Sequence, residues 1–158
     1  MHTLLKILPA LILVLGAGGC CTTAPQGPTG NIPVIDTHIH LYDTTRDGGV
    51  PWPSHSDQVL YRPTLPKHFD KVTSVNGVKA TVIVEASDIV ADNQWVLDLV
   101  AHNPKHYVGL VGNLPLGTDA FAPALEKLAQ DSRYVGIRLR GFAEGVDGFT
   151  DEVWRDLK

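Results

Sequence analysis

Short apolar runs alternate with longer amphipathic segments along residues 33–158. Four of these runs are dense in β-branched residues, as strands buried on both faces of a parallel sheet should be. They predict strands at residues 33–38, 80–85, 107–111 and 135–139. We therefore expect a sheet of parallel strands joined by helices.

Apolar positions at helical spacing predict the connecting helices. The expected helices cover residues 65–75, 92–102 and 119–130, and another begins at Thr150 and runs to Lys158. Pro66 lies in the first turn of its helix, where proline is tolerated. Asp92 is a candidate N-cap, because its side chain can accept a hydrogen bond from a free backbone amide.

The regular repeat of strand and helix predicts an α/β fold, the N-terminal part of a (β/α)8 TIM barrel with about four β/α units. A doubly wound open sheet is an alternative, because four such units repeat alike in both architectures. A complete barrel takes about 250 residues, whereas this chain has 158. We expect residues 32–158 to form a partial barrel domain, either in a fragment or in a half-barrel covered by a second chain.

A long segment separates the first predicted strand from the first helix. Residues 41–63 include Trp52, His55 and Tyr61, and they are too many for a plain connection. We expect an active-site loop in which Trp52 contacts substrate. Equally, its aromatic residues could cover apolar surface at the rim of the barrel.

Residues 1–19 have the pattern of a lipoprotein-type signal peptide. Lys6 precedes an apolar run at residues 7–15, and small residues lead into Cys20. A membrane-spanning helix needs roughly 20 apolar residues, so this run is too short for a permanent span. The small residues before Cys20 resemble a bacterial lipobox, in which the cysteine that follows the cleavage site carries a diacylglycerol.

Cys20 and Cys21 are the only cysteines of the chain, and adjacent cysteines rarely pair because the bridge strains the backbone. Lipid attachment at Cys20 explains them better than a disulfide, with a plain secreted protein as the alternative. Residues 20–31 are rich in Pro, Gly and Thr and predict a flexible tether. We expect export across the inner membrane and anchoring at a membrane surface, on the periplasmic or cell-surface side.

Composition narrows the possible partners. The chain has 13 Lys and Arg against 17 Asp and Glu, which gives a net charge of -4. No basic stripe with interleaved aromatic residues is present, so the pattern of a nucleic-acid-binding protein is missing. The expected partners are a small-molecule substrate and the membrane surface.

The strongest chemical signal is the pair His38 and His40, in the motif DTHIH at residues 36–40. Residues two apart on a strand project from the same side, so both imidazoles can face one divalent metal or one oxyanion. Taken alone, the pair could also be two surface histidines at the end of a strand.

The segments at these strand ends resemble the amidohydrolase superfamily. VIDTHIHLYD at residues 34–43 is similar to its first-strand motif. TVIVEAS, NQWVL, VGLVGN and VGIRL follow at residues 81–87, 93–97, 108–113 and 135–139. In this order they resemble the amidohydrolase-related (amidohydrolase 2) group that contains sugar lactonases and 2-pyrone-4,6-dicarboxylate lactonase. Tyr42 departs from the pattern, since many relatives have Trp there.

The resemblance implies a hydrolase that opens a lactone or another cyclic ester or amide. His38 and His40 would be catalytic, either as ligands of a zinc-like divalent metal or, without a metal, as groups that bind the substrate carbonyl. Glu85 could complete a metal site, contact substrate, or form an ion pair with an arginine. Arg138, as a catalytic and substrate-binding residue, and Arg140, as a substrate-binding residue, could hold a carboxylate or lactone. A salt bridge to Glu85 or Asp36 is the alternative for both arginines.

In the family, the general base is an aspartate at the end of the eighth strand, and further histidines come from the fifth and sixth. The predicted strands of this chain stop at the fourth, so we expect an incomplete site that is poorly active alone. The alternative function is a catalytically inactive, lipid-anchored half-barrel that serves as a binding or assembly module.

Overall fold

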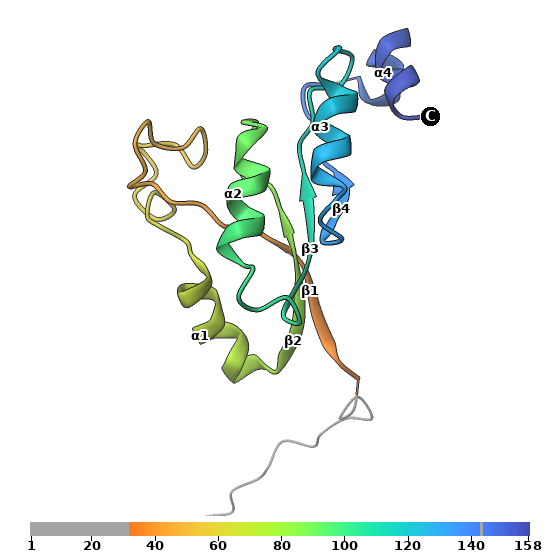
Figure 1. Ribbon diagram of the computed structural model, residues 1–158. Coiled ribbons are helices and arrows are strands. Elements are labelled where there is room, and N and C mark those ends of the chain that lie inside the picture. Colours follow the sequence, from red (N-terminus) through yellow and green to blue (C-terminus); the bar gives the residue numbers. More distant parts are fainter. Residues whose placement is uncertain (1–31, 143) are drawn as a thin grey trace, which may run out of the picture. The chain divides into compact units, whose positions relative to one another are not determined.

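Four parallel strands lie side by side in the order β1-β2-β3-β4 (Figure 1). The strands are β1 (Val34–Ile39), β2 (Val78–Val84), β3 (Tyr107–Gly112) and β4 (Tyr134–Ile137). All four were predicted, with ends that differ by no more than two residues. Spatial order follows chain order, as in a barrel, whereas the order reverses within a doubly wound sheet.

This computed structural model describes residues 32–142 and 144–158. The predicted signal peptide at residues 1–19, the tether at residues 20–31 and the lipid site at Cys20 lie outside the described residues. In the described part of the chain, no helix is both long enough and apolar enough to cross a membrane.

The helices follow the strands, as expected for β/α units. They are α1 (Pro66–Asn76), α2 (Ala91–Leu99), α3 (Phe121–Leu128) and α4 (Asp151–Asp156). Pro66 starts α1, and Gly77, with a φ of 70°, ends it in the left-handed conformation that glycine adopts without strain. The chain therefore turns directly from α1 into β2.

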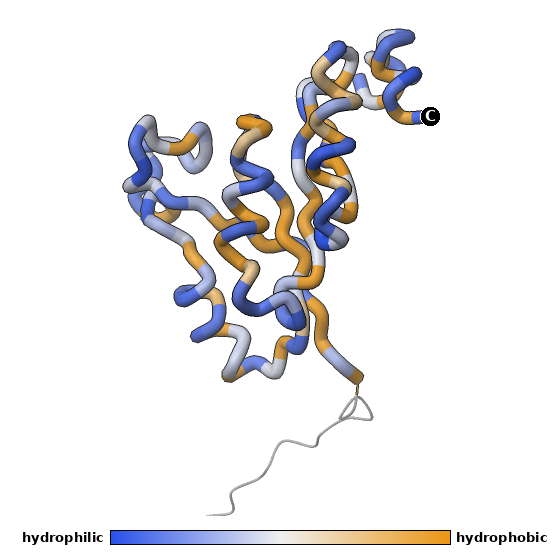
Figure 2. The backbone as a smooth tube through the Cα atoms, in the orientation of Figure 1, coloured by the Kyte–Doolittle hydropathy of each residue, from blue (hydrophilic) through white to orange (hydrophobic). Residues whose placement is uncertain are grey.

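A core of buried apolar side chains packs α2 and α3 against the sheet. Ile83, Tyr107 and Leu110 of the strands are each 1% exposed and pack with Leu97 of α2 and Phe121 of α3. Figure 2 shows mainly hydrophobic stretches along the strands, while the helices alternate between hydrophobic and hydrophilic residues. This pattern is what parallel strands covered by amphipathic helices require.

The predicted N-cap of α2 is wrong. The N-cap is Val90, and Asp92 lies inside the first turn of the helix with its carboxylate paired to Arg46. Acidic residues are favoured both at the N-cap and in the first turn, because the N-terminal end of a helix carries the positive end of its dipole. The helix also ends at Leu99, three residues earlier than predicted, and the following Val100 is buried in the core.

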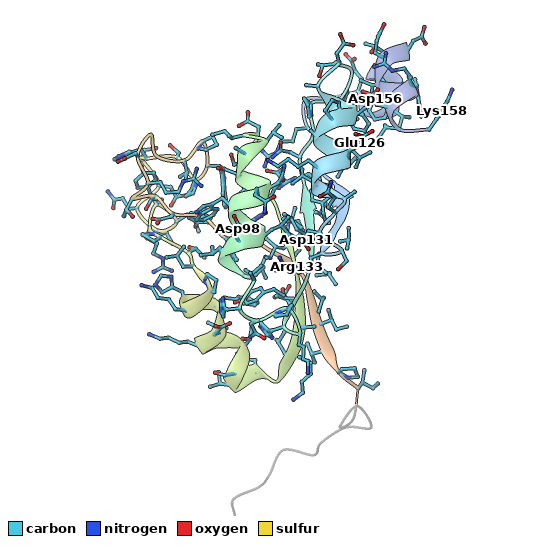
Figure 3. All side chains as sticks on the ribbon, viewed as in Figure 1. Asp98, Glu126, Asp131, Arg133, Asp156 and Lys158 are labelled. Atoms are coloured by element: carbon cyan, nitrogen blue, oxygen red, sulfur yellow. The ribbon has the colours of Figure 1, made fainter. Side chains whose placement is uncertain are left out.

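An ion pair lies at the end of the sheet where the strands begin. Arg133 and Asp131, both labelled in Figure 3, lie in the turn that leads into β4, with Arg133 Nη2 2.6 Å from Asp131 Oδ2. The Arg133 guanidinium lowers the pKa of Asp131, so the carboxylate stays charged. This pair holds the turn in place before β4.

Candidate functional site

The predicted site residues gather where the parallel strands end. His38 and His40 come from the end of β1, Glu85 follows β2, and Arg138 and Arg140 follow β4. The ends of β2 and β4 are in direct contact, since Arg138 Nη1 donates to the backbone oxygen of Glu85 at 3.1 Å. Chemistry in this fold lies at the carboxyl ends of the strands, which is the rim where these residues meet.

The histidine pair has the geometry that its spacing predicts. The ring centroids of His38 and His40 are 5.0 Å apart, with the rings edge to face. His40 Nδ1 lies 2.8 Å from the backbone oxygen of Val84. A carbonyl oxygen only accepts, so Nδ1 carries the proton, and Nε2 of the neutral ring keeps a free lone pair.

The surroundings of His40 favour this neutral form. Burial lowers the pKa of His40 from its ordinary value of 6.5, outweighing the hydrogen bond to Val84, which raises it. The positive charge of Arg138 lowers the pKa further, while the carboxylate of Glu85 acts in the opposite direction. At neutral pH, His40 therefore offers a lone pair rather than a charge.

Trp52 brings the long loop to this pair. Its ring centroid lies 5.2 Å from that of His40 and 5.4 Å from that of Tyr42. Trp52 is 37% exposed, so part of the ring is free to contact a ligand. The loop thus forms one wall beside His40, and the contact of Trp52 with substrate stays a prediction.

Glu85 forms the ion pair that was one of its three sequence-based alternatives. Arg140 donates from Nε to Oε1 at 2.6 Å and from Nη2 to Oε2 at 2.9 Å. Arg138 Nε lies 3.7 Å from Oε1. The Asp36 carboxylate instead accepts from the backbone amide of His38 at 3.1 Å. Glu85 therefore holds Arg138 and Arg140 together at the rim.

Both arginines keep donors for a further partner. Their side chains are 37% (Arg138) and 40% (Arg140) exposed, whereas that of Glu85 is 4% exposed. Arg140 uses Nε and Nη2 on Glu85, which leaves Nη1 without a hydrogen bond to the described residues. Guanidinium groups in this position can receive a carboxylate or a polarised carbonyl, so their predicted substrate role fits the geometry and stays a prediction.

The described residues do not complete a metal site. No group of three or more His, Cys, Asp or Glu side chains in residues 32–142 and 144–158 is arranged to hold a metal ion. Catalytic zinc takes three protein ligands, and the histidine pair supplies two. Both oxygens of Glu85 already accept from Arg140. Metal binding through His38, His40 and Glu85 stays a prediction.

Sequence reasoning missed the contact of Arg46 with α2. Arg46 Nη2 donates to Asp92 Oδ1 at 2.7 Å, and its guanidinium carbon lies 4.7 Å from the centroid of the Trp95 ring. No local pattern indicates this contact, because the partners are more than 40 positions apart.

A buried amide pair behind the rim was also missed. Asn113 donates its backbone amide to Asn93 Oδ1 at 3.0 Å, and Asn93 Nδ2 donates to the backbone oxygen of Asn113 at 2.8 Å. Asn113 Nδ2 further donates to the backbone oxygen of Ser87 at 2.8 Å. This network joins the segments that follow β2 and β3. Both asparagines lie in the segments NQWVL and VGLVGN, so a signal was present in the sequence.

Comparisons with known proteins agree with this architecture. The amidohydrolase family model matches residues 35–157. An L-fucono-1,5-lactonase from Burkholderia ambifaria is 33% identical over 124 residues, which cover 77% of this chain and 40% of that protein.

Two crystal structures of an amidohydrolase from Burkholderia multivorans share the fold. The one with bound zinc has a TM-score of 0.64 at 21% identity, and the one with bound HEPES has 0.66 at 20%. Each match covers 79% of this chain and 44% of the other. The prediction of a partial barrel is confirmed, and the chain spans less than half the length of these relatives.

Proposed function

We propose that this chain, which belongs to the amidohydrolase family, forms part of a hydrolase that opens a lactone or another cyclic ester or amide. The family match and the similarity to a lactonase confirm the resemblance that the sequence motifs predicted. The observation that carries the proposal is the placement of a neutral His40, its partner His38 and the Arg138 guanidinium at one rim.

The tautomer of His40 suggests a different role for each of the two histidines. Nε2 of His40 can accept a hydrogen bond from an attacking water and so orient its oxygen toward the carbonyl carbon. His38 is exposed and can donate to the carbonyl oxygen. The negative charge that develops on this oxygen is stabilised by Arg138.

Hydrolysis adds the water oxygen to the carbonyl carbon and breaks the ring C–O bond, or C–N bond in an amide. The product is a hydroxy acid, or an amino acid from a cyclic amide. The water's proton needs a base, and an aspartate from a later strand is still our expectation for that role. When bound by His38 and His40, a divalent metal would polarise the carbonyl or the water, and the Nε2 lone pair of His40 would then bind the metal instead of the water.

An assay on the product of the complete reading frame tests the proposal. The substrates are sugar 1,5-lactones, sugar 1,4-lactones and pyrone dicarboxylates, with acid release measured above the spontaneous rate. We expect the His38→Ala, His40→Ala double variant to lose most of the activity, and His102→Ala, at an exposed histidine distant in sequence from the motif, to retain it. Equal rates in the double variant and the unmodified protein would remove the histidine pair from the mechanism.

We further propose that Cys20 carries a lipid and holds the domain at residues 32–158 to a membrane surface. Support comes from the signal-like residues 1–19 and the adjacent Cys20 and Cys21. Expression with radiolabelled palmitate should label the unmodified protein and Cys21→Ser, but not Cys20→Ser. Labelling of Cys20→Ser, or an unlabelled membrane-free protein, would contradict lipid attachment at this position.

A further inference from the structure

The long loop between β1 and α1 is closed at its base. Tyr42 donates its backbone amide to Thr64 at 2.9 Å and accepts from the Thr64 amide at 2.8 Å. The Tyr42 hydroxyl also donates to the backbone oxygen of Leu60 at 3.0 Å. Residues 43–63, called the rim segment below, therefore leave the barrel and return to it at one point.

Arg46 attaches this rim segment to α2. Its guanidinium donates to Asp92 and lies over the Trp95 ring, so one side chain contacts two residues of the same helix. The Arg46 side chain is 25% exposed and that of Asp92 is 12% exposed. Ion pairing and stacking on an aromatic face together are characteristic of arginine, since lysine lacks the planar group.

Detachment of Arg46 would leave two groups without their partner. The Asp92 carboxylate is largely buried, and a buried carboxylate without a cation is unfavourable. The Trp95 face would also lose the guanidinium that covers it. The contact therefore favours the docked position of the rim segment over positions farther from α2.

The docked segment carries the wall beside the histidine pair. Trp52 follows Arg46 by six residues and contacts the His40 ring at 5.2 Å between centroids. Arg46, Trp52 and Asp92 line one cavity. Arg46, which holds the segment, and Trp52, which lies next to His40, thus line the same cavity.

We propose that Arg46 is a positioning residue, which sets the place of Trp52 beside His40 through its contacts with Asp92 and Trp95. The proposal rests on the proposed hydrolase function for its effect on substrate. Loss of the contact lets Trp52 move away from His40, so substrate binding weakens while the groups that act on the carbonyl stay in place. A change in binding alone raises KM and leaves kcat nearly unchanged.

The test compares Arg46→Ala with Arg62→Ala in the complete protein. Arg62 is an exposed arginine of the same segment, with no ion pair among the described residues. Amide hydrogen exchange reports the position of the rim segment without any assay of activity. Lactone hydrolysis gives KM and kcat separately.

For Arg46→Ala we expect exchange to accelerate about tenfold or more in residues 43–63 only. We also expect KM to rise about tenfold with kcat changed less than about threefold. Arg62→Ala should match the unmodified protein in both measurements. Arg46→Lys should give values between those of Arg46→Ala and the unmodified protein, because it keeps the charge and loses the planar contact with Trp95.

Three results for Arg46→Ala would overturn the proposal. The first is unchanged exchange in residues 43–63, and the second is faster exchange throughout the chain. The third is faster exchange in residues 43–63 with an unchanged KM. If Arg46→Ala does not fold, Asp92→Asn decides by the same criteria, since it removes the charge and keeps the size. Absence of hydrolysis in the unmodified protein, with faster local exchange in the variant, would reject the hydrolase function and the positioning role but confirm the attachment of the segment.

Discussion

Arg140 donates to both carboxylate oxygens of Glu85, and the two side chains differ widely in exposure, at 40% and 4% respectively. Glu85 is thus a buried anion, whose charge is balanced by Arg140 and by the more distant Arg138. The arginines themselves are partly hydrated. Removal of the cation and removal of the anion should therefore have unequal effects on stability.

We expect Arg140→Ala to lower the free energy of unfolding by roughly 2–3 kcal/mol, because it leaves the Glu85 carboxylate buried with a weaker partner. Glu85→Gln should cost about 1 kcal/mol, since water can solvate the released guanidinium groups. Denaturant unfolding of the complete protein measures both values.

The control is Arg62→Ala, which removes an exposed arginine and should change the free energy of unfolding by less than about 0.5 kcal/mol. A larger loss for Glu85→Gln than for Arg140→Ala would contradict the view that the buried anion is the vulnerable member of the pair.

Gly112 lies at the end of β3, where two side chains approach the backbone. A Cβ atom at this position would overlap Asn93 Oδ1 and the Tyr134 ring. Asn93 cannot move aside freely, because it exchanges hydrogen bonds with Asn113. We therefore expect Gly112→Ala to destabilise the protein by about 2–3 kcal/mol in denaturant unfolding.

Gly148→Ala serves as the matched substitution. There the nearest atom to the new Cβ would be Glu144 Oε2 at 3.4 Å, the end of a flexible side chain. A cost below about 1 kcal/mol is expected for Gly148→Ala. Similar costs for the two alanine variants would mean that the crowding around Gly112 is easily relieved.

The prediction of the strands succeeded because each strand carries its own signal. Residues 107–111 and 80–85 are rich in apolar and β-branched residues, and such runs indicate buried parallel strands without knowledge of their partners. The placement of His38 and His40 followed from the same local rule, since a spacing of two fixes the side of a strand. Helix ends were less accurate, because the last turn of α2 depends on packing in the core.

The ion pairs of the site could not be predicted from local patterns. Asp92 has the same preference for an N-cap as for the first turn of a helix, and its true partner, Arg46, lies on a distant loop. Glu85 had three chemically reasonable roles, and the structure shows an ion pair with Arg140. Such choices depend on which strand ends are brought together by the sheet.

Tyr107 is 1% exposed, and its hydroxyl donates to Asp70 Oδ1 at 2.7 Å. Tyr107→Phe removes the donor and leaves the carboxylate without it, so we expect a loss of about 1–2 kcal/mol at pH 8. Tyr61→Phe, on the rim segment, should cost less than about 0.5 kcal/mol.

This loss should shrink in alkaline solution. Burial, followed by the hydrogen bond to Asp70, raises the pKa of Tyr107 above its ordinary value of 10.0. Above pH 10 the unfolded chain releases this proton and the folded chain keeps it, so the unmodified protein loses stability as pH rises. Phenylalanine does not titrate. A difference between the two proteins that stays constant or grows from pH 8 to 10.5 would contradict the assignment.

His40 should make the protein less stable in acid. Its pKa in the folded protein lies below the ordinary value of 6.5, chiefly because of burial. As pH falls through 6.5, His40 is protonated in the unfolded chain while it is still neutral in the folded chain. The unfolded state then binds more protons, so stability declines as pH falls toward the folded pKa.

Substitution of His40 by Asn isolates this effect, since the asparagine amide can still donate to the backbone oxygen of Val84 and does not titrate. We expect the stability of the unmodified protein, relative to His40→Asn, to fall between pH 7.5 and 5.5 in denaturant unfolding with a chelator present. His102→Asn, at an exposed position, is the control for the loss of an imidazole. Parallel stability curves for His40→Asn and the unmodified protein would show that His40 titrates alike in both states, and the neutral imidazole in the proposed mechanism would then lose its basis.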